Sequence, residues 1–217
     1  MSWLNLPNAI TLGRIALAIL VAPLILTDDF GVRVAGMVVF LAAAFSDLWD
    51  GHLARSRNLI TDFGKLMDPL ADKLLLAATF VPFYLLSHGM EPETPFPWFG
   101  DVLPAWILAV IFGRELFITV FRGYAAKRGV VLAAGAAGKL KAVIQNVFIG
   151  SGIVWYALHS KARADGWRGG FWEGAWLPFH FWFTVVALAL AVILTVWSLA
   201  VYLNTFRALN LGGSGPR

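Results

Sequence analysis

The stretch DLWDGHLARSRNLITDFGKLMDPLAD, residues 47–72, carries five aspartates between two apolar runs. VVFLAAAF lies a few residues before its first aspartate, and LLLAATFVPFYLL follows its last aspartate almost directly. Ionised carboxylates are costly in a bilayer, and acids within membrane segments are functional candidates by default. The stretch therefore predicts a polar site built into a membrane protein.

The composition of the whole chain supports that interpretation. Its 217 residues are 59% hydrophobic and 14% charged, with a mean hydropathy of +0.73. Soluble domains are usually about half apolar and about a quarter charged. The absence of cysteine excludes disulfides and thiolate metal sites. The net charge of +4 comes from basic residues that lie mostly at the ends of apolar segments, which favours contacts with lipid headgroups over nucleic acid.

Six apolar runs approach or exceed the roughly 20 residues that a membrane-spanning helix needs. They cover residues 9–26, 32–55, 64–87, 102–124, 138–158 and 178–203. None shows the period-two alternation of a strand. We therefore expect an all-α, polytopic membrane protein with six transmembrane helices and one domain over residues 1–217. SWLNLPN, residues 2–8, is expected to form a short interfacial segment, and residues 206–217 a flexible tail.

Basic residues predict the orientation in the membrane. They gather in the connection between the second and third runs and in that between the fourth and fifth: Arg55, Arg57, Lys65, Arg122, Lys127, Arg128, Lys139 and Lys141. Because cytoplasmic loops are rich in Lys and Arg, both termini and the aspartate stretch are expected in the cytosol. Residues 159–177 run against this prediction, since they should lie outside and yet carry Lys161, Arg163 and Arg168.

Four of the aspartates form two pairs at helical spacing. Asp47 and Asp50 are three residues apart, and Asp68 and Asp72 are four apart on the next run. Such pairs share a helix face, and two antiparallel neighbours joined by a short loop can turn these faces toward each other. Four carboxylates cannot all stay ionised in a low-dielectric pocket without cations. Two Mg²⁺ or Mn²⁺ ions fit oxygen ligands and would clamp the attacking and leaving oxygens at a phosphorus centre.

The residues between the acids suit an anionic ligand. Gly51 and Ala54 are small and share the helix face of the first pair, while Arg55 is suited to a phosphate. Gly64 would clear similar space on the facing helix. Asp62 is expected to cap a helix rather than to bind metal. The alternative is that all these acids cap helices or pair with lysines such as Lys65 and Lys73.

The spacing Asp47-x2-Asp50-Gly51-x2-Ala54-Arg55-x8-Gly64-x3-Asp68-x3-Asp72 resembles the signature of the CDP-alcohol phosphotransferase family, with every fixed position present. The resemblance implies a membrane enzyme that transfers a phosphatidyl or similar group from a CDP-linked donor to an alcohol and releases CMP. It also implies a homodimer and a two-metal centre held by Asp47, Asp50, Asp68 and Asp72.

The resemblance further implies individual roles. Asp72 would take the proton of the acceptor hydroxyl as the catalytic base. Asp50, Gly51, Ala54, Arg55 and Gly64 would form the nucleotide site. A cation transporter that uses the acids as an ion path is the rival of another class, but an ion path has no need of Arg55.

Shorter segments point to the acceptor. LPNAITLGR, TDFGKLMDPLADKLL, GRELFITVFR and GKLKA resemble segments of bacterial phosphatidylglycerophosphate synthases, although Ala142 stands where Thr is usual. The resemblance implies CDP-diacylglycerol and glycerol 3-phosphate as substrates and a bacterial inner membrane as the location. An inositol phosphate or a lipid alcohol remains the alternative acceptor.

Basic residues near the fourth and fifth runs are the candidates for binding the phosphate of the acceptor. They are Arg114, Lys139 and Lys141. The two lysines have an alternative role as topology signals, and Arg114 as the partner of an acid within the helix bundle. Near the N-terminus the candidate substrate contacts are Asn8, Thr11 and Arg14, although helix capping would explain Asn8 or Thr11 equally well.

Overall fold

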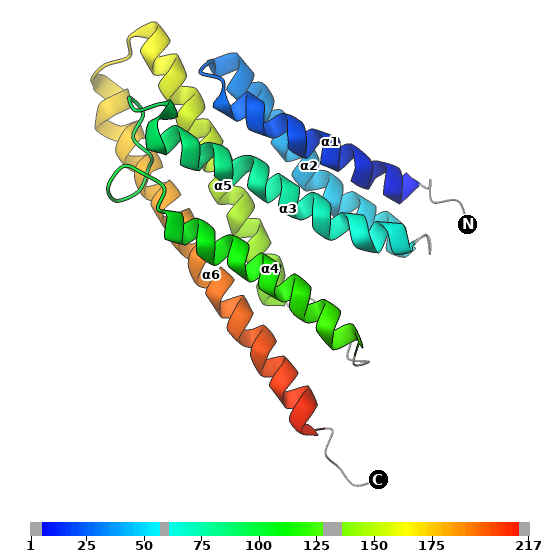
Figure 1. Cartoon of the computed structure of the whole chain (residues 1–217). Helices are drawn as coiled ribbons and strands as arrows, with labels where there is room; N and C mark the ends of the chain where they lie inside the picture. Colours follow the sequence, from blue (N-terminus) through cyan, green and yellow to red (C-terminus); the bar gives the residue numbers. More distant parts are fainter. Residues whose placement is uncertain (1–5, 57–60, 128–135, 213–217) are drawn as a thin grey trace, which may run out of the picture. The chain divides into compact units, whose positions relative to one another are not determined.

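The computed structural model describes the backbone of residues 6–56, 61–127 and 136–212. Within these ranges it leaves the side chains of residues 47–56, 62, 65, 126–127, 136–137 and 206–212 undescribed. The long elements are α1 (Leu6–Leu26), α2 (Phe30–Ser56), α3 (Asp62–Leu85), α4 (Ala105–Lys127), α5 (Ala136–Asp165) and α6 (Leu177–Gly212), as Figure 1 shows. Two single π-helical turns, η1 (Leu86–Met90) and η2 (Trp172–Trp176), precede the segment after α3 and helix α6. The all-α prediction is confirmed, with one helix for each apolar run.

Four helical stretches of the described residues are long and apolar enough to cross a membrane. They are Leu6–Leu26, Leu66–Met90, Gly138–Asp165 and Trp172–Thr205, while Phe30–Ser46 is a shorter apolar stretch. These stretches identify a membrane protein. The expected number of six crossings stays a prediction.

The chain forms two compact units. The first contains residues 1–103 and 149–182, and the second contains residues 104–148 and 183–217. Helices α5 and α6 contribute residues to both. The expectation of one domain over residues 1–217 stays a prediction.

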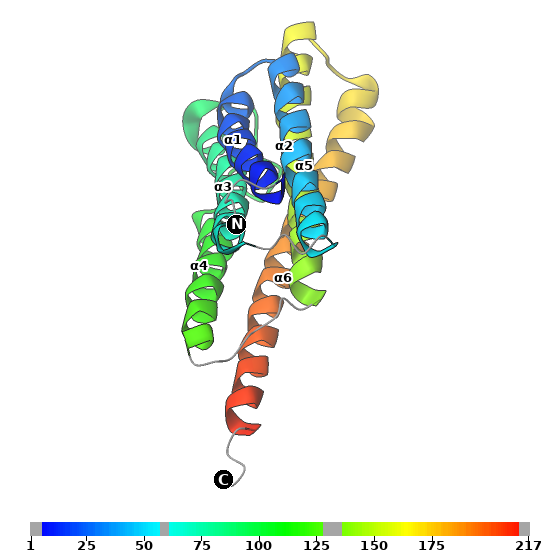
Figure 2. The ribbon, with the colours of Figure 1, turned by 90° about the vertical axis from the view of Figure 1, so that its right-hand side faces the viewer.

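Helix α1 is the central element of the first unit. It packs against both α2 and α3, and Figure 2 shows it between them. Its buried positions follow helical spacing: Pro7, Asn8, Thr11, Arg14, Ala18, Val21 and Ile25. The first half of this buried face is polar and the second half is apolar. Gly36 lets α2 approach closely, because a Cβ there would lie 3.1 Å from Cβ of Leu24.

The start of α3 differs by one residue from the sequence prediction. Asp62 was expected to cap a helix from the preceding loop, but it is the first residue of α3 and Thr61 is the cap. Thr61 has extended backbone angles (φ −120°, ψ 156°), and its Oγ1 accepts a hydrogen bond of 3.0 Å from the Gly64 amide. Threonine serves this position as well as aspartate does, since either side chain offers an oxygen to the N3 amide.

The two ends of the chain were expected to lie outside the membrane-spanning helices, residues 2–8 as a short interfacial segment and residues 206–217 as a flexible tail. Of the predicted interfacial segment, residues 2–5 lie outside the described residues, and Leu6, Pro7 and Asn8 belong to α1 itself. At the other end, α6 continues as a helix to Gly212, past residue 206 where the tail was expected to begin. Residues 213–217 lie outside the described part of the chain.

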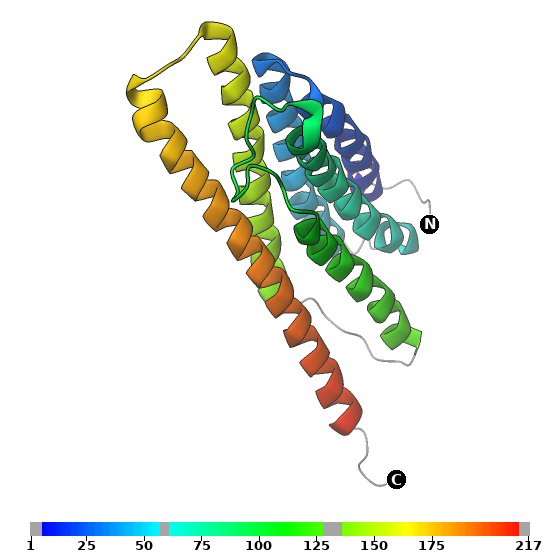
Figure 3. The same ribbon diagram turned by 60° about the vertical axis from the view of Figure 1, so that its left-hand side comes forward.

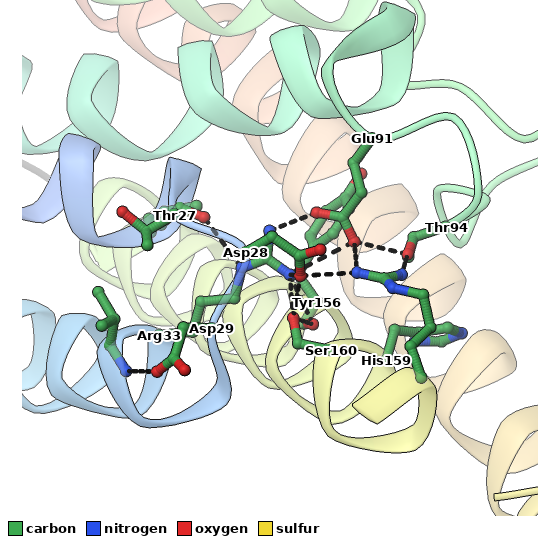
Figure 4. A network of polar contacts seen from close by, with 12 residues as sticks. Thr27, Asp28, Asp29, Arg33, Glu91, Thr94, Tyr156, His159 and Ser160 are labelled. Atoms are coloured by element: carbon green, nitrogen blue, oxygen red, sulfur yellow. Dashed lines mark hydrogen bonds and ion pairs between the residues drawn. The ribbon is translucent and has the colours of Figure 1, made fainter. Parts of the chain in front are cut away.

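Charged and polar side chains join four segments at one end of the first unit (Figure 4), where the α1–α2 connection lies beside the end of α5 (Figure 3). This Arg33 cluster comprises Asp28, Arg33, Glu91, Thr94, Ser160 and Arg163. Arg33 is fully buried and pairs with Glu91, and it also donates to the Tyr156 carbonyl (2.9 Å) and the Ile25 carbonyl (3.1 Å). The cluster ties the α1–α2 connection and the start of α2 to the segment after α3 and the end of α5.

The Arg33 cluster accounts for Arg163, one of the three basic residues in the segment 159–177 that runs against the charge pattern. Arg163 lies 2.7 Å from a carboxylate oxygen of Asp28 and 2.5 Å from one of Glu91. Its positive charge is therefore neutralised by acids of the same protein. Burial opposes ionisation of Asp28, but hydrogen bonds from Ser160 and Arg163 and the charge of Arg163 outweigh it and lower the pKa of Asp28. Asp28 therefore stays ionised at neutral pH and keeps the cluster balanced.

Candidate active site

Asp68 and Asp72 lie one turn apart on α3, and α1 contacts both. Thr11 Oγ1 donates a hydrogen bond of 2.9 Å to Oδ1 of Asp68. Arg14 Nη1 lies 3.0 Å from Oδ1 of Asp72. The Arg14 side chain is fully buried, whereas that of Asp72 is 58% exposed. This arrangement holds one oxygen of each carboxylate from the inside and leaves Asp72 accessible.

The other half of the signature lies on α2. Because α2 continues as a helix to Ser56, the first aspartate pair and the small residues that follow are helical, as the sequence predicts. The side chains of Asp47, Asp50, Gly51, Ala54 and Arg55 belong to residues 47–56, outside those that the structure describes. Their convergence on Asp68 and Asp72 stays a prediction.

The donor chemistry of the described acids fits hard divalent ions. Among the described side chains, no group of three or more His, Cys, Asp or Glu residues is close enough to hold a metal ion. Asp47 and Asp50, which are half of the predicted ligand set, are not among the described side chains. Asp68 and Asp72 supply only carboxylate oxygens, which are the ligands that Mg²⁺ and Mn²⁺ prefer.

Gly64 has a packing role that the sequence did not reveal. A Cβ at this position would lie 3.0 Å from Oδ1 of Asn8 and 3.3 Å from Oγ1 of Thr61. Thr61 in turn donates a hydrogen bond of 3.0 Å to Oδ1 of Asn8. Glycine therefore lets the first turn of α1 approach the first turn of α3, and a nucleotide contact at Gly64 stays a prediction.

The second unit places two of the three acceptor-site candidates on one acid. Arg114 Nη1 lies 2.9 Å from Oε1 of Glu115, and Lys141 Nζ of α5 pairs with the same oxygen. Lys141 is buried, whereas Lys139 is exposed. An arginine within an apolar run predicts a nearby anion, and Glu115 is that anion for Arg114. The sequence did not reveal that Glu115 also joins Arg114 to Lys141.

The fold and these polar groups define an integral membrane enzyme whose acids and buried cations lie on apolar helices. A model of the family described as CDP-alcohol phosphatidyltransferase matches residues 4–197, so the chain belongs to this family. The resemblance that the aspartate signature suggested is thereby confirmed.

Several relatives carry more specific names. A Bacillus subtilis protein named CDP-diacylglycerol–glycerol-3-phosphate 3-phosphatidyltransferase is 37% identical over 161 residues, which cover 67% of this chain and 74% of the relative. A protein of the same activity name from Arabidopsis thaliana chloroplasts and mitochondria is 34% identical over 93% of this chain and 62% of its own length. A probable phosphatidylglycerophosphate synthase of Mycobacterium tuberculosis is 35% identical over 67% of this chain and 64% of its own length. The chain thus spans less than two thirds of the latter two relatives.

Proposed function

We propose that the chain transfers the phosphatidyl group of CDP-diacylglycerol to sn-glycerol 3-phosphate. The 1-hydroxyl oxygen of the acceptor bonds to the β-phosphorus, and the bond from that phosphorus to the CMP oxygen breaks. The products are phosphatidylglycerophosphate and CMP. The observation that carries this proposal is the complete aspartate signature, together with family membership and the names of the relatives.

Each acid has a role in the proposed reaction. Asp72 takes the proton of the attacking hydroxyl, for which its exposed carboxylate is suited. Asp47, Asp50, Asp68 and Asp72 hold two Mg²⁺ or Mn²⁺ ions. When bound, such ions neutralise phosphate charge and make phosphorus easier to attack. On the nucleotide, Arg55 pairs with a phosphate, and Asp50, Gly51, Ala54 and Gly64 let the donor approach the helices.

The acceptor's phosphate is a dianion, and we assign its recognition to Arg114, Lys139 and Lys141. Glu115 holds the first and last of these at one oxygen, so their positions are fixed before the acceptor arrives. Asn8, Thr11 and Arg14 stay candidates for substrate contact. Arg14 and Thr11, however, already contact the aspartates.

Lys141→Gln is expected to raise KM for glycerol 3-phosphate by at least about tenfold, because a charge-assisted hydrogen bond to phosphate contributes about 1.5–3 kcal/mol. KM for CDP-diacylglycerol should stay within a factor of about three. Lys139→Gln is the matched control two residues away. Because Lys139 is exposed, we expect a smaller rise than for Lys141→Gln. Equal effects of the two substitutions would contradict the ranking, and no effect of either would remove both lysines from the acceptor site. Steady-state kinetics with each substrate varied in turn provide the measurement.

A direct assay tests the proposed function itself. The purified chain is given CDP-diacylglycerol and Mg²⁺ or Mn²⁺, with one of three acceptors (glycerol 3-phosphate, inositol phosphate or a lipid alcohol) or with no acceptor. We expect CMP release with glycerol 3-phosphate above all others. CMP release with a different alcohol alone would show that this alcohol, and not glycerol 3-phosphate, is the acceptor. Metal-ion flux into vesicles without CMP release would favour the transporter.

We propose that the chain forms a homodimer in the inner membrane of a bacterial cell and takes its donor from the surrounding lipid. We also propose that its active site faces the cytosol.

The orientation in the membrane can be tested with single cysteines, since the chain has none of its own. A membrane-impermeant maleimide is expected to label Glu93→Cys, in the exposed segment after α3, on intact cells with the outer membrane permeabilised. It should label Thr205→Cys, near the end of α6, only after the inner membrane is opened. The reverse pattern would invert the proposed topology.

A further inference from the structure

The polar half of the α1 buried face calls for an explanation of its own. The exposed fractions of Thr11 and Arg14 are only 2% and 1%, on a helix whose one other polar side chain is Asn8. Burying a charged side chain costs several kcal/mol unless it is paired and hydrogen-bonded. A helix that only spans a membrane has no use for either residue, so their partners indicate what they do.

Their partners are Asp68 and Asp72 of α3. The donors are three residues apart on α1 and the acceptors are four apart on α3, so each spacing places its pair on one face of its helix. Both contacts use Oδ1. The Thr11 hydroxyl also lies 3.1 Å from the Pro7 carbonyl, so its single proton serves one acceptor at a time.

The contact between Arg14 and Asp72 is asymmetric. The guanidinium is enclosed, while the carboxylate that it holds is more than half exposed. A pair that served only to join helices would gain more from full burial of both partners, because water screens an exposed pair. An enclosed cation that fixes an accessible carboxylate instead orients that carboxylate toward whatever approaches from outside.

The first turns of α1 and α3 are fixed relative to each other by a second set of contacts. Asn8 accepts from Thr61, Thr61 accepts from the Gly64 amide, and Gly64 leaves no room for a Cβ between them. This set lies one turn before the aspartate contacts on both helices. It sets the register in which Thr11 meets Asp68 and Arg14 meets Asp72.

We propose that Arg14 and Thr11 are positioning residues for the reaction, with Arg14 orienting the carboxylate of Asp72 and Thr11 that of Asp68. This inference rests on the proposed function, because it assigns Asp72 the role of base. It assigns Arg14 and Thr11 to the aspartates rather than to a substrate. Removing an outer partner of a metal ligand or base typically costs about 10–100-fold in activity or metal affinity.

Kinetics of Arg14→Met and Arg14→Lys test the proposal. We expect Arg14→Met to lower kcat for CMP release by about 10–100-fold with KM for either substrate within about threefold, the signature of an interaction that matters in the transition state. Arg14→Lys should recover most of the rate, because it restores a cation. A rise in KM with unchanged kcat would make Arg14 a substrate contact and overturn the proposal.

Thr11 offers a matched control within the same unit. Thr11→Val is expected to lower kcat by about tenfold or more and Thr11→Ser to restore it. Thr79→Val changes a buried threonine on α3 whose hydroxyl donates only to carbonyls of its own helix, at 3.0–3.1 Å, and should leave kcat unchanged. If Thr79→Val and Thr11→Val lower kcat equally, the effect is general packing and not positioning.

A stability cycle provides a readout that needs no activity. If Arg14 and Asp72 are paired, the shifts in apparent Tm caused by Arg14→Met and by Asp72→Leu should be strongly non-additive in the double variant, because each substitution removes the contact. Additive shifts would show that the pair is absent and would end the proposal. If the pair is present and wild type releases CMP, but Arg14→Met keeps full kcat, positioning fails while the proposed function stands. If wild type releases no CMP with any acceptor, the proposed function fails and the positioning proposal fails with it, whatever the cycle shows.

Discussion

Asp72→Asn is expected to lower kcat for CMP release by about 10³-fold or more and to leave the protein folded. General base catalysis typically contributes about 10²–10⁴-fold, and an amide can neither take the proton nor ligate a metal as a carboxylate does. In the wild type, Arg14 Nη1 donates a hydrogen bond of 3.0 Å to Oδ1 of Asp72. The amide oxygen of the variant can accept the same hydrogen bond, so the contact between α1 and α3 is kept. The measurement is CMP release with CDP-diacylglycerol and glycerol 3-phosphate.

Asp62→Asn is the matched control for this prediction. It makes the same change on the same helix, but Asp62 begins α3 and stands outside the paired spacing of the signature. Activity within a factor of about three of wild type is expected, because Thr61, and not Asp62, caps α3 and Asp62 has no assigned role in the reaction. Full activity of Asp72→Asn would remove Asp72 from the role of base. Equal losses in both variants would show that the assay responds to any charge change on α3.

The helices were predictable from the sequence because their cause is local. An apolar run of about 20 residues must satisfy its backbone hydrogen bonds internally in a membrane, and a helix does this. Helix ends depend on single side chains, and there the sequence erred by one residue between Thr61 and Asp62. The tail was predicted to begin at residue 206, but α6 stays helical to Gly212.

The pairings across helices were not predictable because they depend on register. Thr11 and Asp68 are 57 residues apart, and Arg14 and Asp72 are 58 apart. Helical periodicity tells which residues share a face of one helix, but not how far a neighbouring helix slides along it. The energetic cost of a buried arginine did predict that Arg114 needs a partner, and it left open that the partner would be the next residue, Glu115.

The two ends of the first unit use buried arginine in opposite ways. Arg14 holds an aspartate that is 58% exposed, whereas Arg33 holds a glutamate that is 7% exposed. One end therefore presents a carboxylate to the outside, and the other encloses the Arg33–Glu91 pair. An exposed acid serves chemistry and an enclosed pair resists separation. Substitutions at the two ends should accordingly separate activity from stability.

Arg33→Ala is expected to cause the largest loss of stability, about 3–5 kcal/mol, which corresponds to a fall in apparent Tm on the order of 10 °C. Arg33 is fully buried, pairs with Glu91, and donates a hydrogen bond of 2.9 Å to the Tyr156 carbonyl. Its removal leaves the buried Glu91 with Arg163 as its cationic partner. The Tyr156 carbonyl of α5 also loses the hydrogen bond from Arg33. Thermal unfolding of the purified chain in detergent, at pH 7, gives the apparent Tm.

Lys161→Ala removes a basic residue from the same end of the unit and serves as the control. Lys161 pairs at 2.8 Å with Asp165 four residues on, and both side chains are 38% exposed. Such pairs contribute about 0.3–0.5 kcal/mol, so Tm should barely move. Well below its Tm, Arg33→Ala should still release CMP at a rate near wild type, because Arg33 lies at the end of α1–α3 away from Asp72. A variant that keeps wild-type Tm would show that the Arg33 cluster does not hold these helices together, and lost CMP release at full stability would connect it to the reaction.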